Sequence, residues 1–215
     1  MSNTYQKLNL IQSNLKIKHG SFDQEVPEQF MTVLALTGNE KVLELGGNIG
    51  RNSLIIASIL NNPENLLTLE SDTNICSQLR ENRDLNCLNF HIENAALSNR
   101  KLIQKGWNTV PSNILLDGYN WINTITFKEL KEKYKIEFDT LVLDCEGAFY
   151  YILVDMPEIL DNINLIIVEN DYTDPSHKLY VDNILKNNSF TLVYYESVGY
   201  VPSYCNPFYE IWKKL

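Results

Sequence analysis

Short apolar runs alternate with segments of helical periodicity along most of the chain, and this alternation restricts the fold more than any other feature of the sequence. The runs span residues 42–45, 66–69, 88–92, 141–143, 165–168, 190–195 and 208–212. Helical stretches separate most of them, and strands joined in this way form a parallel sheet that is covered on both faces. We therefore predict an α/β fold with a seven-stranded sheet.

The connection between the last two runs differs from the others. Residues 197–206 contain Gly199 and Pro202 and show no helical pattern. Glycine and proline favour turns, and two strands joined without a helix pair in an antiparallel manner. We expect an antiparallel hairpin at the end of the chain.

Residues 104–121 match neither the strand period nor the helix period. A long irregular segment in a compact α/β domain is typical of a functional loop, and a disordered surface excursion is the alternative. The segment carries Trp107, Tyr119 and Trp121, whose ring faces suit sugar rings or flat apolar molecules but also pack loops. We assign it as a substrate-side loop and keep the alternative open.

The size and charge of the chain limit its function. The 215 residues, 44% of them apolar, suffice for one domain with a substantial core but not for two. The 18 basic and 27 acidic residues give a net charge of −9, which repels nucleic acids and anionic lipid surfaces. No apolar run approaches the ~18 residues of a membrane span, and the four cysteines form no C-x-x-C pair. We expect a single cytoplasmic domain, alone or as a homodimer, that binds neither nucleic acid nor membrane.

A glycine-rich turn between the first strand and the next helix is the strongest motif. Glu44, Gly46, Asn48 and Gly50 follow the spacing E-x-G-x-N-x-G. Glycine lets the chain turn tightly and lets a ligand approach the backbone. The spacing differs from the G-x-G-x-x-G of dinucleotide sites, and a carboxylate at this strand end suits a cation rather than a pyrophosphate. The turn predicts a site for an amino-acid or sulfonium ligand.

Two more positions indicate an adenosyl site. Glu70 ends the second strand, twenty residues after Gly50. An acidic side chain at this strand end can accept hydrogen bonds from both hydroxyls of a ribose, in NAD sites as in adenosyl sites. After the third strand, Asn94 is placed to meet an adenine edge, and the small Ala95 could lie flat against the ring.

Several segments of the chain resemble the FkbM family of S-adenosylmethionine-dependent methyltransferases, over about residues 42–171; they read VLELGGNIG, LESD, ENAALS, FDTLVLDCEG and INLIIVEN. The resemblance implies a class I, Rossmann-like methyltransferase fold with sheet order 3-2-1-4-5-7-6 and strand 7 antiparallel. It also implies O-methylation of a hydroxyl on a sugar or a glycosylated small molecule. Asp144, Glu146 and Gly147 match the family's D-x-E-G element, whereas Glu44 replaces the commoner Asp and Phe149 stands where a second Glu is usual.

The candidate cofactor-binding residues belong to the turn, the second strand end, the segment after the third strand and the fourth strand end: Glu44, Gly46, Gly47, Asn48, Gly50, Asn52, Glu70, Ser71, Asn94, Ala95 and Asp144. The candidate catalytic residues are Asp144, Glu146 and His19. Asp144 is interpreted as a general base or substrate anchor, with a helix N-cap as the alternative. His19 lies in the N-terminal helical segment, residues 1–38, which we expect to cover the cofactor; it is either a base or an ordinary loop histidine.

Acidic residues at the ends of the fourth and fifth strands leave a metal-dependent alternative. Asp144, Glu169 and Asn170 resemble the oxygen ligands of Mg-dependent catechol-type O-methyltransferases, and carboxylates suit divalent cations. The FkbM resemblance itself calls for no metal. The leading hypothesis is therefore an S-adenosylmethionine-dependent O-methyltransferase with a small-molecule or glycan acceptor. An NAD-dependent dehydrogenase and a non-catalytic binding module are the competing hypotheses.

Overall fold

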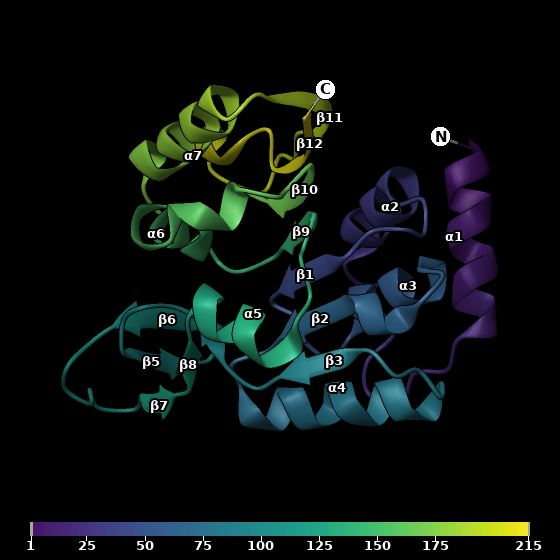
Figure 1. The fold of residues 1–215 in the computed structure, drawn as a ribbon, viewed down its shortest axis with the longest axis horizontal. Helices are drawn as coiled ribbons and strands as arrows, with labels where there is room; N and C mark the ends of the chain where they lie inside the picture. Colours follow the sequence, from purple (N-terminus) through teal and green to yellow (C-terminus); the bar gives the residue numbers. More distant parts are fainter. Residues whose placement is uncertain (1, 215) are drawn as a thin grey trace.

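The computed structural model describes residues 2–214, in which a seven-stranded sheet separates two groups of helices (Figure 1). The strands of this sheet are β1 (Val42–Leu45), β2 (Leu66–Leu69), β3 (His91–Glu93), β9 (Thr140–Leu143), β10 (Leu165–Glu169), β11 (Phe190–Glu196) and β12 (Tyr209–Lys214). The helices are α1 (Ser2–Asn14), α2 (Val26–Ala35), α3 (Arg51–Ile59), α4 (Thr73–Leu85), α5 (Phe127–Tyr134), α6 (Ala148–Asp155) and α7 (Pro175–Asn187). Short 3-10 turns lie at Pro63–Asn65, Pro157–Leu160 and Ser203–Cys205.

The strand order is β11-β12-β10-β9-β1-β2-β3, with β12 antiparallel to both of its neighbours. If the seven strands of this sheet are numbered 1 to 7 along the chain, the order read from β3 is 3-2-1-4-5-7-6. The predicted topology and the antiparallel final hairpin are therefore confirmed. The chain passes from β1 to β2 and β3 on one side and returns to β9 on the other side of β1. Ligands of such sheets bind where the order reverses, beyond the carboxyl ends of the strands.

Each face of the sheet buries its own set of side chains, because successive residues of a strand point to opposite faces. On one face, Leu43 and Leu45 of β1 pack with residues of α5, α6 and α7. On the other face, Val42 packs with residues of α2, α3 and α4. The central strands are therefore apolar at nearly every position, as the short runs in the sequence indicated.

Capping residues begin two of the helices, α5 and α7. Thr126 accepts a hydrogen bond from the Glu129 amide while the Glu129 carboxylate accepts one from the Thr126 amide, which is a capping box for α5. Asp174 accepts from the Ser176 amide and caps α7, with Pro175 in the first helical position.

Residues 104–121 contain regular structure, so the expectation of an irregular segment was wrong. Strands β5 (Leu102–Lys105), β6 (Asn108–Pro111) and β7 (Asn120–Ile122) form a small antiparallel sheet that projects from the body (Figure 1). A two-stranded parallel pair, β4 (Ala96–Leu97) and β8 (Thr124–Ile125), lies at its base. Strands β5, β6 and β7 are short, and all of their residues except Ile103 are partly or fully exposed, so they carry no alternation of apolar and polar residues for the sequence to reveal.

The described part of the N-terminal segment contains two helices, α1 and α2. Helix α1 packs against α2 and α3, and α2 packs against β10 and β12. None of the helices within residues 2–214 combines the length and the apolar composition needed to cross a membrane.

A carboxylate is buried in the central strand. Glu44 is 3% exposed and accepts hydrogen bonds from the hydroxyls of Ser53 on α3 and Thr68 on β2, each at 2.5 Å. It thereby ties β1 to its neighbouring strand and covering helix. Burial raises the pKa of Glu44 to about 7, with nearby Glu25 and Glu70 adding to the rise and the two hydroxyls opposing it.

Replacing Glu44 by Gln is expected to flatten the pH dependence of stability. Between pH ~4.5, the ordinary pKa of glutamate, and about 7, the folded state retains a proton that the unfolded state has lost, so the free energy of unfolding falls as the pH rises. Glu44→Gln removes a contribution on the order of 3 kcal/mol to that fall. Denaturant unfolding at pH 5, 6, 7 and 8 measures it, with Glu158→Gln on the surface as the control. Equal slopes in both variants would contradict the assignment.

Phe149, the residue that departs from the FkbM pattern, lies on α6 and packs into the core with 1% of its surface exposed. Truncation to Ala leaves a cavity, so Phe149→Ala is expected to lower the free energy of unfolding by about 3–5 kcal/mol. Val154 on the same helix is 44% exposed, and Val154→Ala should change stability by less than ~0.5 kcal/mol. Urea unfolding of the two variants compares them; a mild effect of Phe149→Ala would mean that the site collapses around the truncated side chain.

Candidate functional site

The carboxyl ends of four central strands open into a cavity of about 360 Å³. Leu45, Leu69, Asp144 and Glu169 line it from the ends of β1, β2, β9 and β10. The small β5–β6–β7 sheet and α6 form the opposite wall. The cavity therefore lies at the reversal of strand order, where the sheet topology predicts a ligand.

The glycine turn brings the ends of β1 and β9 into contact. Gly46 has a φ of 89°, and a Cβ built on it would lie 1.6 Å from the carbonyl oxygen of Asp144. Only glycine fits this approach, because both the left-handed backbone and the neighbouring carbonyl exclude a side chain. The Asn48 side chain holds the turn, because its amide nitrogen donates to Glu25 and its oxygen accepts from the Ile49 amide. The turn is thus rigid and forms part of the cavity wall.

Glu70 presents its carboxylate to the cavity in a fixed position. One oxygen accepts the Asn48 amide at 2.9 Å, and the other accepts the Asp72 amide at 2.7 Å. Burial raises the pKa of Glu70, while these backbone hydrogen bonds lower it. Each carboxylate oxygen has a second lone pair, so the side chain can still accept two hydroxyl hydrogen bonds from one diol.

The segment after β3 is only partly directed to the cavity. Ala95 and Ser71 line it. Asn94 is not among the lining residues, because its side chain donates to the carbonyls of Glu70 and Ser71 and accepts from Thr73. Asn94 therefore fixes the loop after β2, and Ala95 provides the flat wall.

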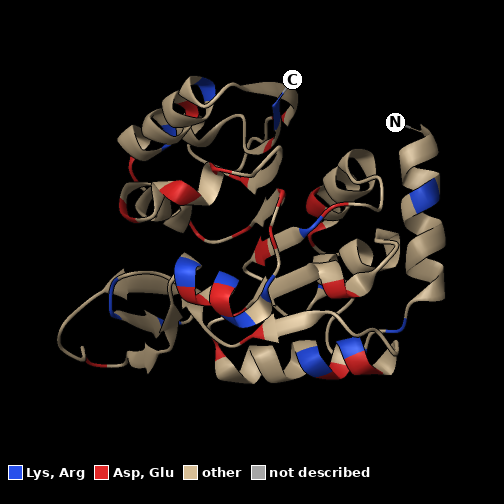
Figure 2. Ribbon diagram, in the orientation of Figure 1, with Lys and Arg blue, Asp and Glu red and all other residues tan. Residues whose placement is uncertain are grey.

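A group of acidic side chains occupies the other end of the cavity. Asp144, Glu146, Glu169 and Asp171 lie at or just beyond the ends of β9 and β10, and red segments mark these strand ends in Figure 2. Burial raises the pKa of all four, and mutual repulsion raises the pKa of Asp144, Glu146 and Glu169 further. Gly147 is the N-cap residue of α6 without a side-chain cap, so the alternative that Asp144 caps this helix was wrong.

Other predicted residues lie elsewhere. His19 contacts Glu81 on the surface, with Nε2 2.9 Å from the carboxylate, and is not in the cavity wall. The Asn170 side-chain amide donates to the Pro207 carbonyl. Glu44, Gly47 and Asn52 line a second, smaller cavity behind the turn, and Gly50 caps α3.

Several residues of the cavity wall were not anticipated. Glu25 and Glu28 come from the start of α2, far from the strands in sequence. Arg100 makes a bidentate ion pair with Asp155, at 2.6 and 2.7 Å, and lies over the Tyr151 ring. No motif marks these residues, because only the packing of α2 and α6 brings them to the strand ends.

The chain is similar to solved structures in its fold, but not in its sequence. No protein-family model and no curated protein matches it. Among solved structures, the O-methyltransferase from Bacillus cereus in complex with SAH superposes with a TM-score of 0.53 at 15% identity, over 98% of this chain and 88% of that one. The ribosomal protein L11 methylase from Lactobacillus delbrueckii subsp. bulgaricus has a TM-score of 0.52 at 13% identity, over 93% and 82% of the two chains.

An rRNA methylase from Streptococcus thermophilus matches with a TM-score of 0.52 at 12% identity, over 87% of this chain and 93% of that chain. At such low identities the likenesses concern the fold alone, and they agree with the observed order of strands. The chain has the fold of the class I S-adenosylmethionine-dependent methyltransferases.

Proposed function

We propose that the protein transfers a methyl group from S-adenosylmethionine to a hydroxyl oxygen of a small acceptor. The observation that carries this proposal is the arrangement of the glycine turn and Glu70 at the strand-order reversal. In this fold, that place suits a ligand with a ribose and a cationic amino-acid group. The FkbM resemblance of residues 42–171 supports a hydroxyl acceptor.

The residues of the cavity fit the parts of S-adenosylmethionine. Glu70 would accept the ribose hydroxyls through its free lone pairs, and Ala95 would contact the adenine ring. The cofactor carries a positive sulfonium and a positive ammonium group, which suit the acidic end of the cavity. NAD fits less well, because a pyrophosphate would meet eight carboxylates in the cavity wall and only one basic side chain, Arg100, among the described residues.

When bound, S-adenosylmethionine supplies an activated methyl group: the acceptor oxygen forms a bond to the methyl carbon while the bond from that carbon to sulfur breaks. The protein then has to orient the acceptor and take up the hydroxyl proton. Asp144 and Glu146 lie in the cavity wall, and burial and neighbouring carboxylates raise the pKa of both, which makes their carboxylates stronger bases than exposed ones.

The acceptor side of the cavity suits a sugar or a glycosylated small molecule. Trp107 and Tyr151 provide ring faces on which a sugar can pack, and the Arg100–Asp155 pair provides polar groups for hydroxyls. These side chains come from the small β-sheet and α6, opposite the glycine turn. This placement supports the proposed substrate-side role of residues 104–121.

Glu70→Gln is expected to weaken S-adenosylmethionine binding by about 10–100-fold, because a charged hydrogen-bond acceptor of the ribose is lost. Isothermal titration calorimetry with S-adenosylmethionine, its demethylated product and NAD measures the affinities. Glu64→Gln, on the exposed connection before β2, is the control and should bind like the wild type. Binding of NAD alone, or unchanged affinity in Glu70→Gln, would contradict the proposed site.

Asp144→Asn is expected to reduce turnover by about 10²–10⁴-fold and to weaken S-adenosylmethionine binding by no more than about tenfold, because it removes a proton acceptor but keeps the shape of the side chain and leaves the other carboxylates of the acidic end in place. Labelled donor with a panel of rhamnosides, fucosides and other glycosides, analysed by mass, measures product formation. Donor binding without product from any acceptor would favour a non-catalytic binding module instead.

A further inference from the structure

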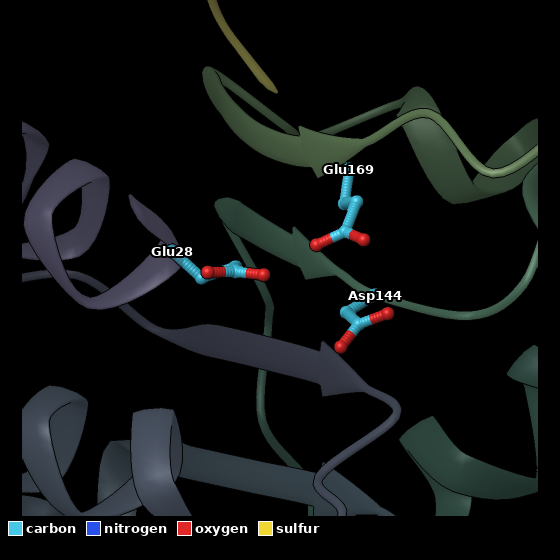
Figure 3. Close-up of side chains that lie close together, drawn as sticks. All are labelled: Glu28, Asp144 and Glu169. Carbon is cyan, nitrogen blue, oxygen red and sulfur yellow. The ribbon is translucent and has the colours of Figure 1, made fainter. Parts of the chain in front are cut away.

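Three carboxylates from different elements meet behind the glycine turn. Glu28 extends from α2, Asp144 from the end of β9 and Glu169 from the end of β10, and Figure 3 shows the three side chains close together, with the carboxylates of Glu28 and Glu169 directed toward each other. One oxygen of each lies within 4.8 Å of one oxygen of each other residue. The three residues line both the larger and the smaller cavity.

No basic side chain neutralises this group within residues 2–214. None of Glu28, Asp144 and Glu169 takes part in an ion pair there. Arg51 pairs with Glu25, and Arg100, which lines the larger cavity, pairs with Asp155. No ion pair in the described part of the chain therefore balances a negative charge on the three residues, and in the cation-free protein burial and mutual repulsion raise the pKa of Asp144 and Glu169.

The group also contains buried oxygens without partners. Glu28 is 7% exposed, and its Oε2 accepts no hydrogen bond; the same holds for Oε2 of Glu169. Buried polar atoms in folded proteins are almost always satisfied, so an unpaired carboxylate oxygen directed at two further carboxylates indicates a missing positive partner. Only oxygen ligands are present, and a set of this kind suits hard divalent cations rather than zinc or copper.

We propose that Glu28, Asp144 and Glu169 bind a divalent cation, with calcium favoured over magnesium because magnesium keeps several waters and usually takes only one or two carboxylates. Three oxygens no more than 4.8 Å apart have a common centre at most about 2.8 Å from each, so calcium–oxygen bonds of about 2.3–2.6 Å are within reach. Glu28 takes the place that the sequence had assigned to Asn170, whose side-chain amide is directed to Pro207.

This cation would lie beside the acidic end of the larger cavity, and its role there rests on the proposed function. A bound divalent cation lowers the pKa of a coordinated hydroxyl, which would assist the loss of the acceptor proton. With Asp144 holding the cation, the proton-accepting role would pass to Glu146, which is outside the ligand set. Binding of the cation itself requires neither S-adenosylmethionine nor an acceptor, so it can be measured separately.

The experiment uses the full chain dialysed against EDTA and then freed of chelator, without S-adenosylmethionine. Calcium, manganese and magnesium chloride are titrated by isothermal titration calorimetry, and thermal unfolding is recorded with and without each salt. At 100 times its Kd, calcium is expected to raise the Tm of the wild type by roughly 5–10 °C. Glu28→Gln should lose this rise, whereas Glu158→Gln, an exposed carboxylate outside the cavity, should retain it.

Glu28→Gln also separates a cation site from a structural defect. Because the substitution removes one of three mutually repelling charges, the metal-free variant should unfold at the same temperature as the wild type or higher. The absence of any cation-induced shift in the wild type, or an equal shift in wild type and Glu28→Gln, would refute the proposal.

Calorimetry with S-adenosylmethionine on the same metal-free protein distinguishes the two proposals. Cofactor binding without cation binding would refute the proposed cation site but not the proposed function. Cation binding by a protein that binds no cofactor would refute the proposed function but not the cation site.

Discussion

The contact between the backbone of Gly46 and the carbonyl of Asp144 is the constraint on which the site depends. It joins the ends of β1 and β9, the two strands between which the order of the sheet reverses. Because no side chain fits at this contact, the glycine turn lies close to the end of β9 and leaves the larger cavity open beside it. Glu70 and Asp144 are held on either side of that space by the adjoining strand ends.

The electrostatics of the cavity follow from the same geometry. Parallel strands end at one edge of the sheet, so acidic residues that follow β9 and β10 are brought together there, and α2 adds Glu25 and Glu28. Burial disfavours the charged forms of these groups, and their repulsion adds to the effect. The cavity is consequently suited to positively charged ligands, whether a sulfonium compound or a divalent cation, and unsuited to phosphates.

The sequence was most informative where residues act through local rules. Periodicity located the strands of the main sheet. It failed for β5, β6 and β7, which are short and show no alternation of apolar and polar residues. It also placed His19 over the cofactor, whereas the Glu81 carboxylate holds this side chain on the surface.

By itself, the sequence determined the order of strands and helices, the glycine turn and the acidic residues at the strand ends, because each depends on neighbours within a few positions along the chain. The tertiary structure alone decided which of these side chains meet. The Asn94 side chain donates to a carbonyl of the loop after β2 instead of lining the cavity, and the Glu44 carboxylate accepts a hydrogen bond from Ser53 on α3. Glu28 lies close to Asp144 and Glu169. The physical reason is that such contacts follow from how α2 and the strands pack, which no short sequence pattern encodes.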